Sequence, residues 1–279
     1  MPLPNLILGG VQKSGTTSAH KMLETHPDVF LPRRPQELHY FDDDANYAQG
    51  LDWYAQYFWD WNGQKVVAQT SPLYLYLPEV PGRVHETLGD VRFLFLLRDP
   101  VERAYSHFWH EVRYGWEDRT FEQALDLEAE RLSGNLHARR TYSYVDRGRY
   151  AGQLARFRAH FPRESIMLVL LEEWSADRAA VCQRLGAFLD VDPTGFTWSS
   201  KPVNRARAPR WPRGQRLVAP FRKRIPKLAR FVDRINLRRQ PYVPMQPATR
   251  ARLTRLFEPE NERLAHEWDL DLSPWRKTT

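Results

Sequence analysis

Two short segments carry residue types and spacings suited to an anionic ligand. The first, Lys13-Ser-Gly-Thr-Thr-Ser18, follows a short apolar run that ends in Gly9 and Gly10. Glycines allow close backbone approach, Lys13 adds a mobile positive charge, and the hydroxyl residues add hydrogen-bond donors. Exposed N–H groups and the positive end of the helix dipole meet at a helix N-terminus. A strand-to-helix turn of this kind therefore favours phosphate or sulfate.

This loop departs from the ATPase pattern. The sequence GxxxxGK[ST] needs a lysine after its second glycine, whereas Lys13 precedes Gly15. No aspartate follows a downstream strand in the manner of a Walker B carboxylate, because Asp99 comes after Arg98 and before Pro100. The pattern indicates a phosphate-binding loop that works without a metal; a merely flexible glycine-rich turn is the alternative.

The second segment begins at Arg98, directly after an apolar run. Ligands of open α/β sheets bind at the carboxyl ends of the strands, so Arg98 is well placed for one. Pro100 is suited to the first turn of a helix, and Ser106 lies two turns further on. An arginine at a strand end and a serine on the next helix could clamp a second phosphate. Taken alone, the Arg-Asp pair is equally consistent with a structural role.

Apolar runs alternate with helical stretches along the chain. Buried strands are predicted at 5–10, 65–68, 92–97 and 166–171, and helices over 101–114, 121–132, 150–160 and 178–189. A C-terminal helix is expected over 250–268, interrupted at Pro259. The alternation predicts an α/β fold with a central, mostly parallel sheet flanked by helices. We expect a single domain over residues 1–279, with a basic, Pro/Arg-rich insertion or lid at about 199–247.

The composition excludes several classes of protein. With 42% hydrophobic and 27% charged residues in 279, the chain is not disordered as a whole. A single cysteine, Cys182, excludes a disulfide framework and a cysteine-rich zinc site. The first residues lack the basic start and long apolar core of a signal peptide, and the apolar runs are too short to span a bilayer. We therefore expect a cytoplasmic protein.

The net charge of +7 is unevenly placed. Residues 201–239 hold 14 Lys and Arg and one acid, Asp233, whereas the other 240 residues hold 27 basic and 33 acidic ones. Arg outnumbers Lys by 34 to 7, which favours bidentate binding of phosphate, sulfate or carboxylate. A mildly acidic body thus carries one basic strip, for which nucleic acid, an acidic substrate, a polyanionic cofactor and a membrane surface are candidate partners.

The two segments together resemble the sulfotransferases that use 3′-phosphoadenylyl sulfate (PAPS). Lys13-Ser-Gly-Thr-Thr-Ser18 resembles the family's 5′-phosphosulfate loop, and Arg98 with Ser106 resembles its 3′-phosphate motif. Glu37-Leu-His-Tyr-Phe-Asp42 is similar to the E-x-H-[FY]-F-D segment of the branch typified by the heparan sulfate glucosaminyl sulfotransferases and their bacterial relatives. Other segments of that branch are matched by Gln69-Thr-Ser-Pro72 with Tyr74, by Gly148-Arg-Tyr150 with Gln153 and Leu154, and by residues 258–275. The resemblance covers nearly the whole chain.

The resemblance implies a P-loop-like nucleotide-binding fold and sulfuryl transfer from PAPS to a hydroxyl or amine of a small-molecule or glycan acceptor. The product would be PAP, and no metal is required. Lys13 would neutralise charge on the leaving phosphate oxygen, and Arg98 and Ser106 would hold the 3′-phosphate. The 5′-phosphate would be cradled by Ser14, Gly15, Thr16, Thr17 and Ser18.

For the acceptor, the resemblance implies that Glu37 is the general base. Partial burial near Tyr40 and Phe41 would have to raise the pKa of Glu37 for it to work near neutrality. His39 is the second candidate base, although an orienting role suits it better. The segment around Gln69 and Thr70 carries no charge where the branch often has Glu or Lys. The acceptor is therefore expected to be less acidic than a heparan chain, or not a polysaccharide.

The basic strip divides into two parts. In the resembling family the loop after the last core strand closes over the nucleotide, which implies that Arg205 and Arg207 reach the 3′-phosphate side. From 215 to 239, apolar residues recur at near-helical spacing between basic ones, interrupted by Pro220 and Pro226. This pattern favours a stretch whose apolar side packs on the core and whose basic side is solvated. A surface for an acidic acceptor or a membrane is the alternative. With the first part assigned to the nucleotide, no nucleic-acid partner is expected.

Two other functions compete with the sulfotransferase. A P-loop-type nucleotide kinase is disfavoured by the position of Lys13 and by the missing Walker B carboxylate. A non-enzymatic polyanion-binding protein that uses residues 201–239 leaves the segments at Lys13 and Arg98 unexplained. The acceptor and the oligomeric state stay open.

Overall fold

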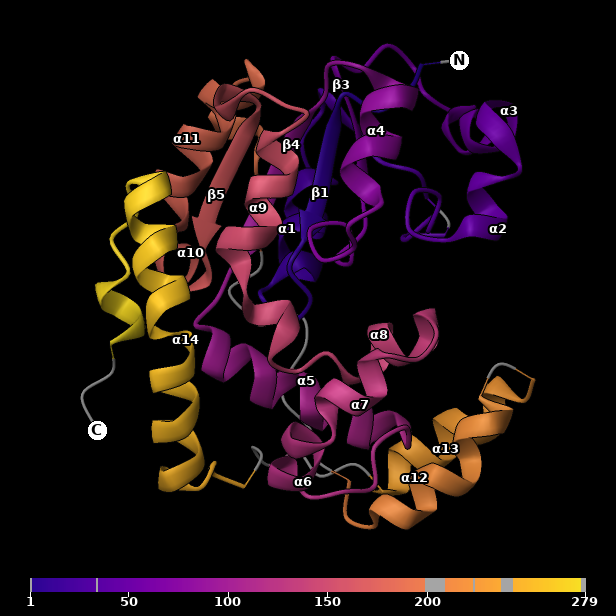
Figure 1. Ribbon diagram of the computed structural model, residues 1–279. Coiled ribbons are helices and arrows are strands. Elements are labelled where there is room, and N and C mark those ends of the chain that lie inside the picture. The colour runs from indigo at the N-terminus through magenta and orange to yellow at the C-terminus, as the bar shows by residue number, and fades with distance from the viewer. Residues whose placement is uncertain (1, 34, 199–208, 223, 237–242, 277–279) are drawn as a thin grey trace. The chain divides into compact units, whose positions relative to one another are not determined.

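A computed structural model of the chain describes residues 2–33, 35–198, 209–222, 224–236 and 243–276 (Figure 1). The chain forms two compact units. The first comprises Met1–Arg98, Ala151–Val203 and Ser273–Thr279, and the second comprises Asp99–Tyr150 and Asn204–Leu272. The single domain over residues 1–279 stays a prediction.

The first unit is built on a five-stranded parallel sheet in the order β2-β3-β1-β4-β5 (Figure 1). The strands are β1 (Leu6–Gly10), β2 (Val29–Phe30), β3 (Val66–Thr70), β4 (Arg92–Leu97) and β5 (Ile166–Leu170). The α/β fold and the four predicted strands are confirmed, and the two-residue strand β2 is added to them. Leu8 of β1 pairs with Thr70 of β3 and with Leu94 of β4. The carboxyl ends of these three strands therefore meet at one edge of the sheet.

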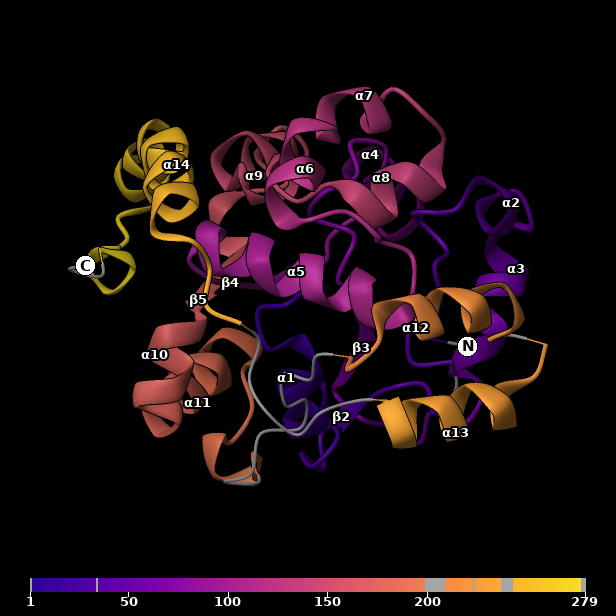
Figure 2. The same cartoon turned by 90° about the horizontal axis from the view of Figure 1, so that it is seen from below.

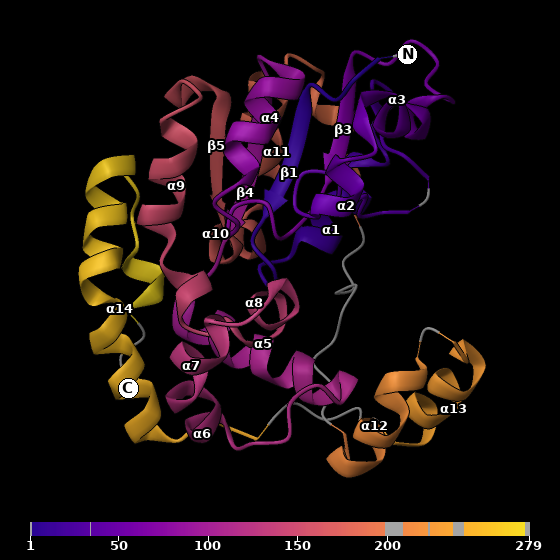
Figure 3. The same ribbon diagram turned by 45° about the vertical axis from the view of Figure 1, so that its right-hand side comes forward.

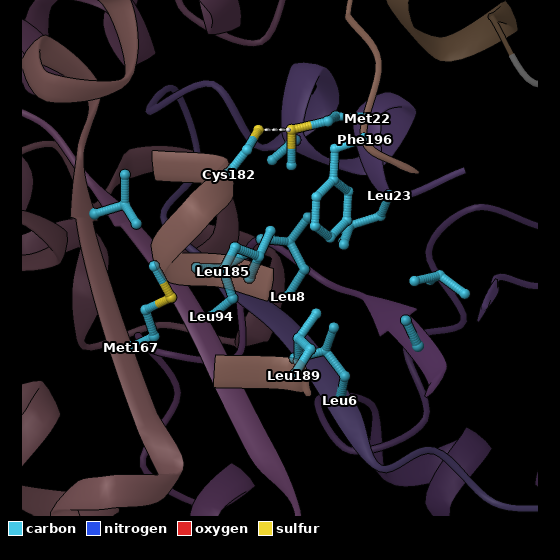
Figure 4. Close-up of a cluster of buried hydrophobic side chains, with 14 of the residues drawn as sticks. Leu6, Leu8, Met22, Leu23, Leu94, Met167, Cys182, Leu185, Leu189 and Phe196 are labelled. Carbon is cyan, nitrogen blue, oxygen red and sulfur yellow. Dashed lines mark hydrogen bonds between the residues drawn. The ribbon is translucent and has the colours of Figure 1, made fainter. Parts of the chain in front are cut away.

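Helices cover both faces of this sheet. On one face α1 (Thr16–Leu23) and α11 (Arg178–Leu189) bury an aliphatic cluster, in which Cys182 Sγ lies 3.5 Å from Met22 Sδ (Figure 4). On the other face Phe93 and Phe95 pack edge-on against Phe157 of α9 (Tyr150–Arg158). Burial raises the pKa of the Cys182 thiol, so this cysteine is a packing residue.

Shorter helices complete the first unit. They are α2 (Asp44–Tyr47), α3 (Gly50–Ala55), α4 (Val80–Leu88) and α10 (Leu171–Ala176). α2 and α3 follow the Glu37–Asp42 segment along the chain, and α10 follows β5 directly. Within the parts of the chain that the structure describes, no helix has the length and hydropathy needed to cross a membrane.

The second unit is helical. It contains α5 (Pro100–Tyr114), α6 (Phe121–Asp126), α7 (Glu128–Leu132), α8 (Leu136–Tyr142), α12 (Pro212–Val218), α13 (Pro226–Asn236) and α14 (Pro247–Trp268). Its core joins Ala104 and Phe108 of α5 to Leu253 and Phe257 of α14. The predicted helix over 121–132 is in fact two helices, because the chain turns at Leu127.

The predicted interruption at Pro259 is wrong, because α14 runs unbroken through it. A proline inside a helix removes one backbone hydrogen bond, here the one that would reach the carbonyl of Arg255. Phe257 and Leu264 are completely buried on either side of Pro259. Their packing holds the helix together across the missing bond.

Candidate functional site

The phosphate loop lies between β1 and α1. The N–H of Ser14 donates to the carbonyl of Val11 at 3.1 Å, and the N–H groups of Ser18 and Ala19 donate to the carbonyl of Gly15 at 2.8 and 3.1 Å. Gly15 is the N-cap of α1 and has φ 91°, a left-handed conformation that favours glycine. The first N–H groups of a helix have no carbonyl partner within it. The loop and the first turn of α1 therefore present N–H groups on one side, a geometry suited to an anion.

Tight packing around the loop explains its composition. A Cβ atom at Gly10 would lie 3.3 Å from the carbonyl oxygen of Pro72, so only glycine fits there without a shift. Ser14 is completely buried, and its hydroxyl has no hydrogen-bond partner in the described parts of the chain. A buried hydroxyl without a partner is costly, and a bound anion is a suitable partner for it. The residues of this loop thus fit a phosphate or sulfate group.

Arg98 is brought to this loop. It follows the last residue of β4, and its Nη1 donates to the carbonyl oxygen of Lys13 at 3.2 Å. Lys13 itself has φ 76°, unusual for a residue other than glycine. The N–H of Val11 donates to the carbonyl of Leu96 at 2.8 Å, which fixes the loop to the same strand. Lys13 and Arg98, separated by 85 positions, are therefore neighbours at the sheet edge.

The other residues expected at the nucleotide lie on other parts of the chain. Ser106 lies on α5, in the second unit, and is nearly buried. Arg205 and Arg207 lie outside the described residues. Thr16 and Thr17 lie in the first turn of α1, and Ser18 follows them.

A second group of polar side chains lies on the segment from Glu37 to Asp42. Glu37 pairs through its backbone with Thr70, the last residue of β3, so it belongs to the same sheet edge. His39 has Nδ1 2.8 Å from Oδ2 of Asp42 and Nε2 3.5 Å from Oε2 of Glu37. The side chain of Glu37 is 40% exposed, whereas that of Asp42 is 0% exposed. An imidazole thus connects a buried carboxylate to an accessible one.

Aromatic side chains pack around this segment. Tyr40 stacks on Tyr54 with ring centroids 4.3 Å apart, and the N–H of Phe41 donates to the hydroxyl of Tyr74 at 3.3 Å. Gln69 accepts a hydrogen bond from the hydroxyl of Tyr54 and donates one to the hydroxyl of Tyr74. Burial raises the pKa of both tyrosines well above their usual range, so they stay protonated. Gln69 is therefore held in a buried position by the hydroxyls of both tyrosines.

Sequence patterns did not single out His20. It lies on α1, and its Nδ1 is 2.8 Å from the hydroxyl oxygen of Thr70. Its Nε2 lies 3.7 Å from Glu24, and burial lowers the pKa of the imidazole. His20 links the helix that follows the phosphate loop to the strand end beside Glu37. A histidine among the buried positions of an amphipathic helix is the one signal that could have pointed to it.

Comparisons with known proteins give the family. Residues 3–205 match the family model described as "Sulfotransferase domain". Mouse "Heparan sulfate glucosamine 3-O-sulfotransferase 5" is 30% identical over 193 residues, which cover 68% of this chain and 54% of the relative. Human "Heparan sulfate glucosamine 3-O-sulfotransferase 3B1" is 30% identical over 189 residues, 68% of this chain and 46% of the relative. The chain thus spans about half the length of these curated relatives.

A solved structure agrees over the whole fold. The sulfotransferase from Alicyclobacillus acidocaldarius superposes with a TM-score of 0.74 at 27% identity, covering 99% of this chain and 100% of that one. This match includes the parallel sheet of the first unit. The chain belongs to the sulfotransferase domain family.

Proposed function

We propose that this protein transfers the sulfuryl group of PAPS to a hydroxyl or amine of a small-molecule or glycan acceptor, with PAP as the product. The contact of Arg98 with the carbonyl of Lys13 carries the proposal, because it joins the two anion-binding segments in a chain of the sulfotransferase family. Two cationic side chains at one loop suit a donor with a phosphosulfate and a further phosphate. No metal is required in this proposal.

The donor side of the site uses residues of the loop and of β4. When bound, PAPS supplies an activated sulfuryl group attached to a phosphate. Lys13 neutralises the charge that develops on the 5′-phosphate oxygen when its bond to sulfur breaks. Arg98 holds the 3′-phosphate together with Ser106. The hydroxyls and N–H groups around α1 hold the 5′-phosphate; they belong to Ser14, Gly15, Thr16, Thr17 and Ser18.

The acceptor side uses the Glu37–Asp42 segment. Glu37 accepts the proton that the acceptor hydroxyl or amine loses, and its exposure leaves it accessible to an acceptor. Asp42 holds the His39 ring, and Nε2 of that ring faces Glu37 at 3.5 Å. His39 is in this proposal a positioning residue for the base.

The acceptor is proposed to be less acidic than a heparan chain. The named relatives act, by their names, on heparan sulfate glucosamine, a charged glycan. The segment around Gln69 and Thr70, which ends β3 beside Glu37, carries no charge here. A screen of labelled PAPS against neutral sugars, phenols and heparan oligosaccharides tests this. Preferential labelling of the heparan oligosaccharides would contradict it.

We also propose that the protein is cytoplasmic. It is supported by the single cysteine, Cys182, which is buried against Met22. Fractionation of cells that express the full chain tests it, and recovery from outside the cytoplasm would contradict it.

Nucleotide binding separates this function from its competitors. PAP should raise the melting temperature by several degrees and ATP with Mg²⁺ should not, because only PAP carries a 3′-phosphate for Arg98. Lys13→Ala should abolish transfer of label from PAPS. Lys21→Ala, an exposed lysine on α1, is the matched control and should leave transfer unchanged. Stabilisation by ATP with Mg²⁺ alone would indicate a kinase, and no response to either nucleotide would leave only polyanion binding.

A further inference from the structure

α12 and α13 form a helical hairpin that exposes large apolar side chains. The two helices lie side by side (Figures 2 and 3). Leu217 is 77% exposed and Phe231 is 60% exposed. The other large apolar side chains that are exposed on the hairpin are Trp211, Phe221, Ile225, Leu228 and Ile235. Water-exposed apolar surface of this extent on one small element marks an interaction site.

The buried residues of the hairpin include the small apolar Val218 and Ala229, and polar contacts fix the hairpin within its own unit. Arg222 donates to Asp233 at 2.9 Å, and to the backbone carbonyls of Arg113 and Tyr114 at 3.3 Å each. Asn236 exchanges two hydrogen bonds of 2.8 Å with the backbone of Trp211. An ordinary surface helix buries its apolar stripe and exposes its polar one. Here ion pairs and hydrogen bonds hold the element in place, and most of its large apolar side chains face solvent.

The sequence of α13 sets an apolar stripe beside a basic one. Leu228, Phe231 and Ile235 follow one another at the spacing of one helix face. Lys227, Arg230 and Arg234 each come one residue earlier, so their stripe is rotated by about 100° around the helix. Over residues 211–236 the chain has eight Lys and Arg and one acid. The exposed surface of the hairpin therefore combines apolar and cationic side chains.

We propose that this hairpin docks on an anionic lipid surface. Its apolar side chains would enter the boundary between headgroups and acyl chains, and the basic stripe would contact lipid phosphates. An acidic polysaccharide matches the charge but offers nothing for Leu217 or Phe231, so the observations favour lipid. Trp211 at one end of the hairpin has the residue type typical of a membrane interface. The inference concerns attachment of the protein and is independent of its proposed transfer reaction.

Vesicle sedimentation tests the proposal. The full chain should pellet with vesicles of phosphatidylcholine and phosphatidylserine in a 7:3 ratio, and far less with phosphatidylcholine alone. Phe231→Ser should weaken binding to the mixed vesicles about tenfold or more, because serine has no apolar side chain to bury among the lipids. Trp59→Ser, an apolar residue 74% exposed in the first unit, is the matched control and should bind like the wild type. The melting temperature of each variant checks the fold.

A charge-reversal variant distinguishes a lipid surface from an acidic polymer. Lys227→Glu with Arg234→Glu should also weaken vesicle binding, by about tenfold at low salt. Equal pelleting with and without phosphatidylserine overturns the proposal, as does wild-type binding by Phe231→Ser. Binding to soluble heparin that requires Lys227 and Arg234 while vesicle binding is absent overturns it in favour of an acidic polymer.

Discussion

The Nδ1 atom of His39 lies 2.8 Å from Oδ2 of Asp42, a carboxylate with no exposed side-chain surface. The backbone of His39 has φ 51°, a conformation that costs a residue other than glycine of order 1 kcal/mol. The contact with Asp42 fixes the orientation of the ring and therefore the direction of Nε2, which faces Glu37. The orientation of His39, and through it the contact with Glu37, thus depends on one buried carboxylate.

Asp42→Asn should lower kcat about tenfold and leave the affinity for PAP unchanged. An asparagine oxygen can still lie against Nδ1. Asparagine lacks the negative charge of Asp42, which holds the ring in one orientation. Transfer from labelled PAPS and titration with PAP measure the two quantities. Asp52→Asn, an exposed carboxylate on α3, is the control and should behave like the wild type. A normal kcat in Asp42→Asn would mean that the buried carboxylate serves packing alone.

Glu37→Gln should lower turnover about 100-fold or more and keep PAP binding, because the amide cannot accept the acceptor proton. His39→Gln should cost less, since it removes only a neighbour of the base. Single-turnover rates at saturating PAPS compare the two variants, and the melting temperature with PAP checks that each still binds. If Glu37→Gln turns over nearly normally while His39→Gln does not, the base is His39.

Local patterns predicted much of this arrangement. Apolar runs identified four strands, and the glycines before Lys13 identified the turn between β1 and α1. That this turn binds an anion stays a prediction. The contact between Arg98 and Lys13 follows from the parallel topology. Arg98 comes directly after β4, Lys13 comes shortly after β1, and the two strands are neighbours. The roles of Glu37, Lys13 and the other site residues in catalysis stay predictions.

Other features depend on tertiary contacts that no local pattern contains. Asp42 could as well have been a turn cap, and its contact with His39 requires a left-handed backbone at that histidine. His20 meets Thr70 across 50 positions of sequence. The helix through Pro259 persists only because Phe257 and Leu264 are buried around it. The periodicity of apolar residues indicates which face of a helix or strand is buried. The contacts of Asp42, His20 and Phe257 depend on which residues pack against that face.

Gly15→Ala should weaken PAP binding about tenfold, whereas Gly50→Ala should not. Both glycines have positive φ, 91° and 79°, so an alanine at either position should lower the free energy of unfolding by about 1 kcal/mol. At Gly15 the new Cβ would also lie 3.0 Å from Leu171 Cδ1, whereas at Gly50 nothing lies within 4 Å. Either the Leu171 side chain or the loop must therefore shift in Gly15→Ala, and neither is needed in Gly50→Ala. Chemical denaturation and PAP titration measure the two effects, and equal PAP affinity in both variants would contradict the placement of the nucleotide at Gly15.

Glu128 should make the second unit less stable as the pH rises through the range from about 4.5 to 7. Burial raises the pKa of this carboxyl to about 7, although backbone N–H groups of Val145 and Asp146 donate to it at 2.8 Å. Between the ordinary pKa of a glutamate and this raised value, the folded chain binds more protons than the unfolded one, so stability falls with increasing pH. Above about 7 the loss is complete, and it amounts to about 3 kcal/mol.

Denaturation of the wild type and of Glu128→Gln at pH 5 and pH 8 isolates this contribution, because the amide does not ionise. Glu130→Gln, an exposed residue of the same helix, should keep the wild-type pH dependence, and a pH dependence in Glu128→Gln that matches the wild type would show that the buried carboxyl does not titrate in this range.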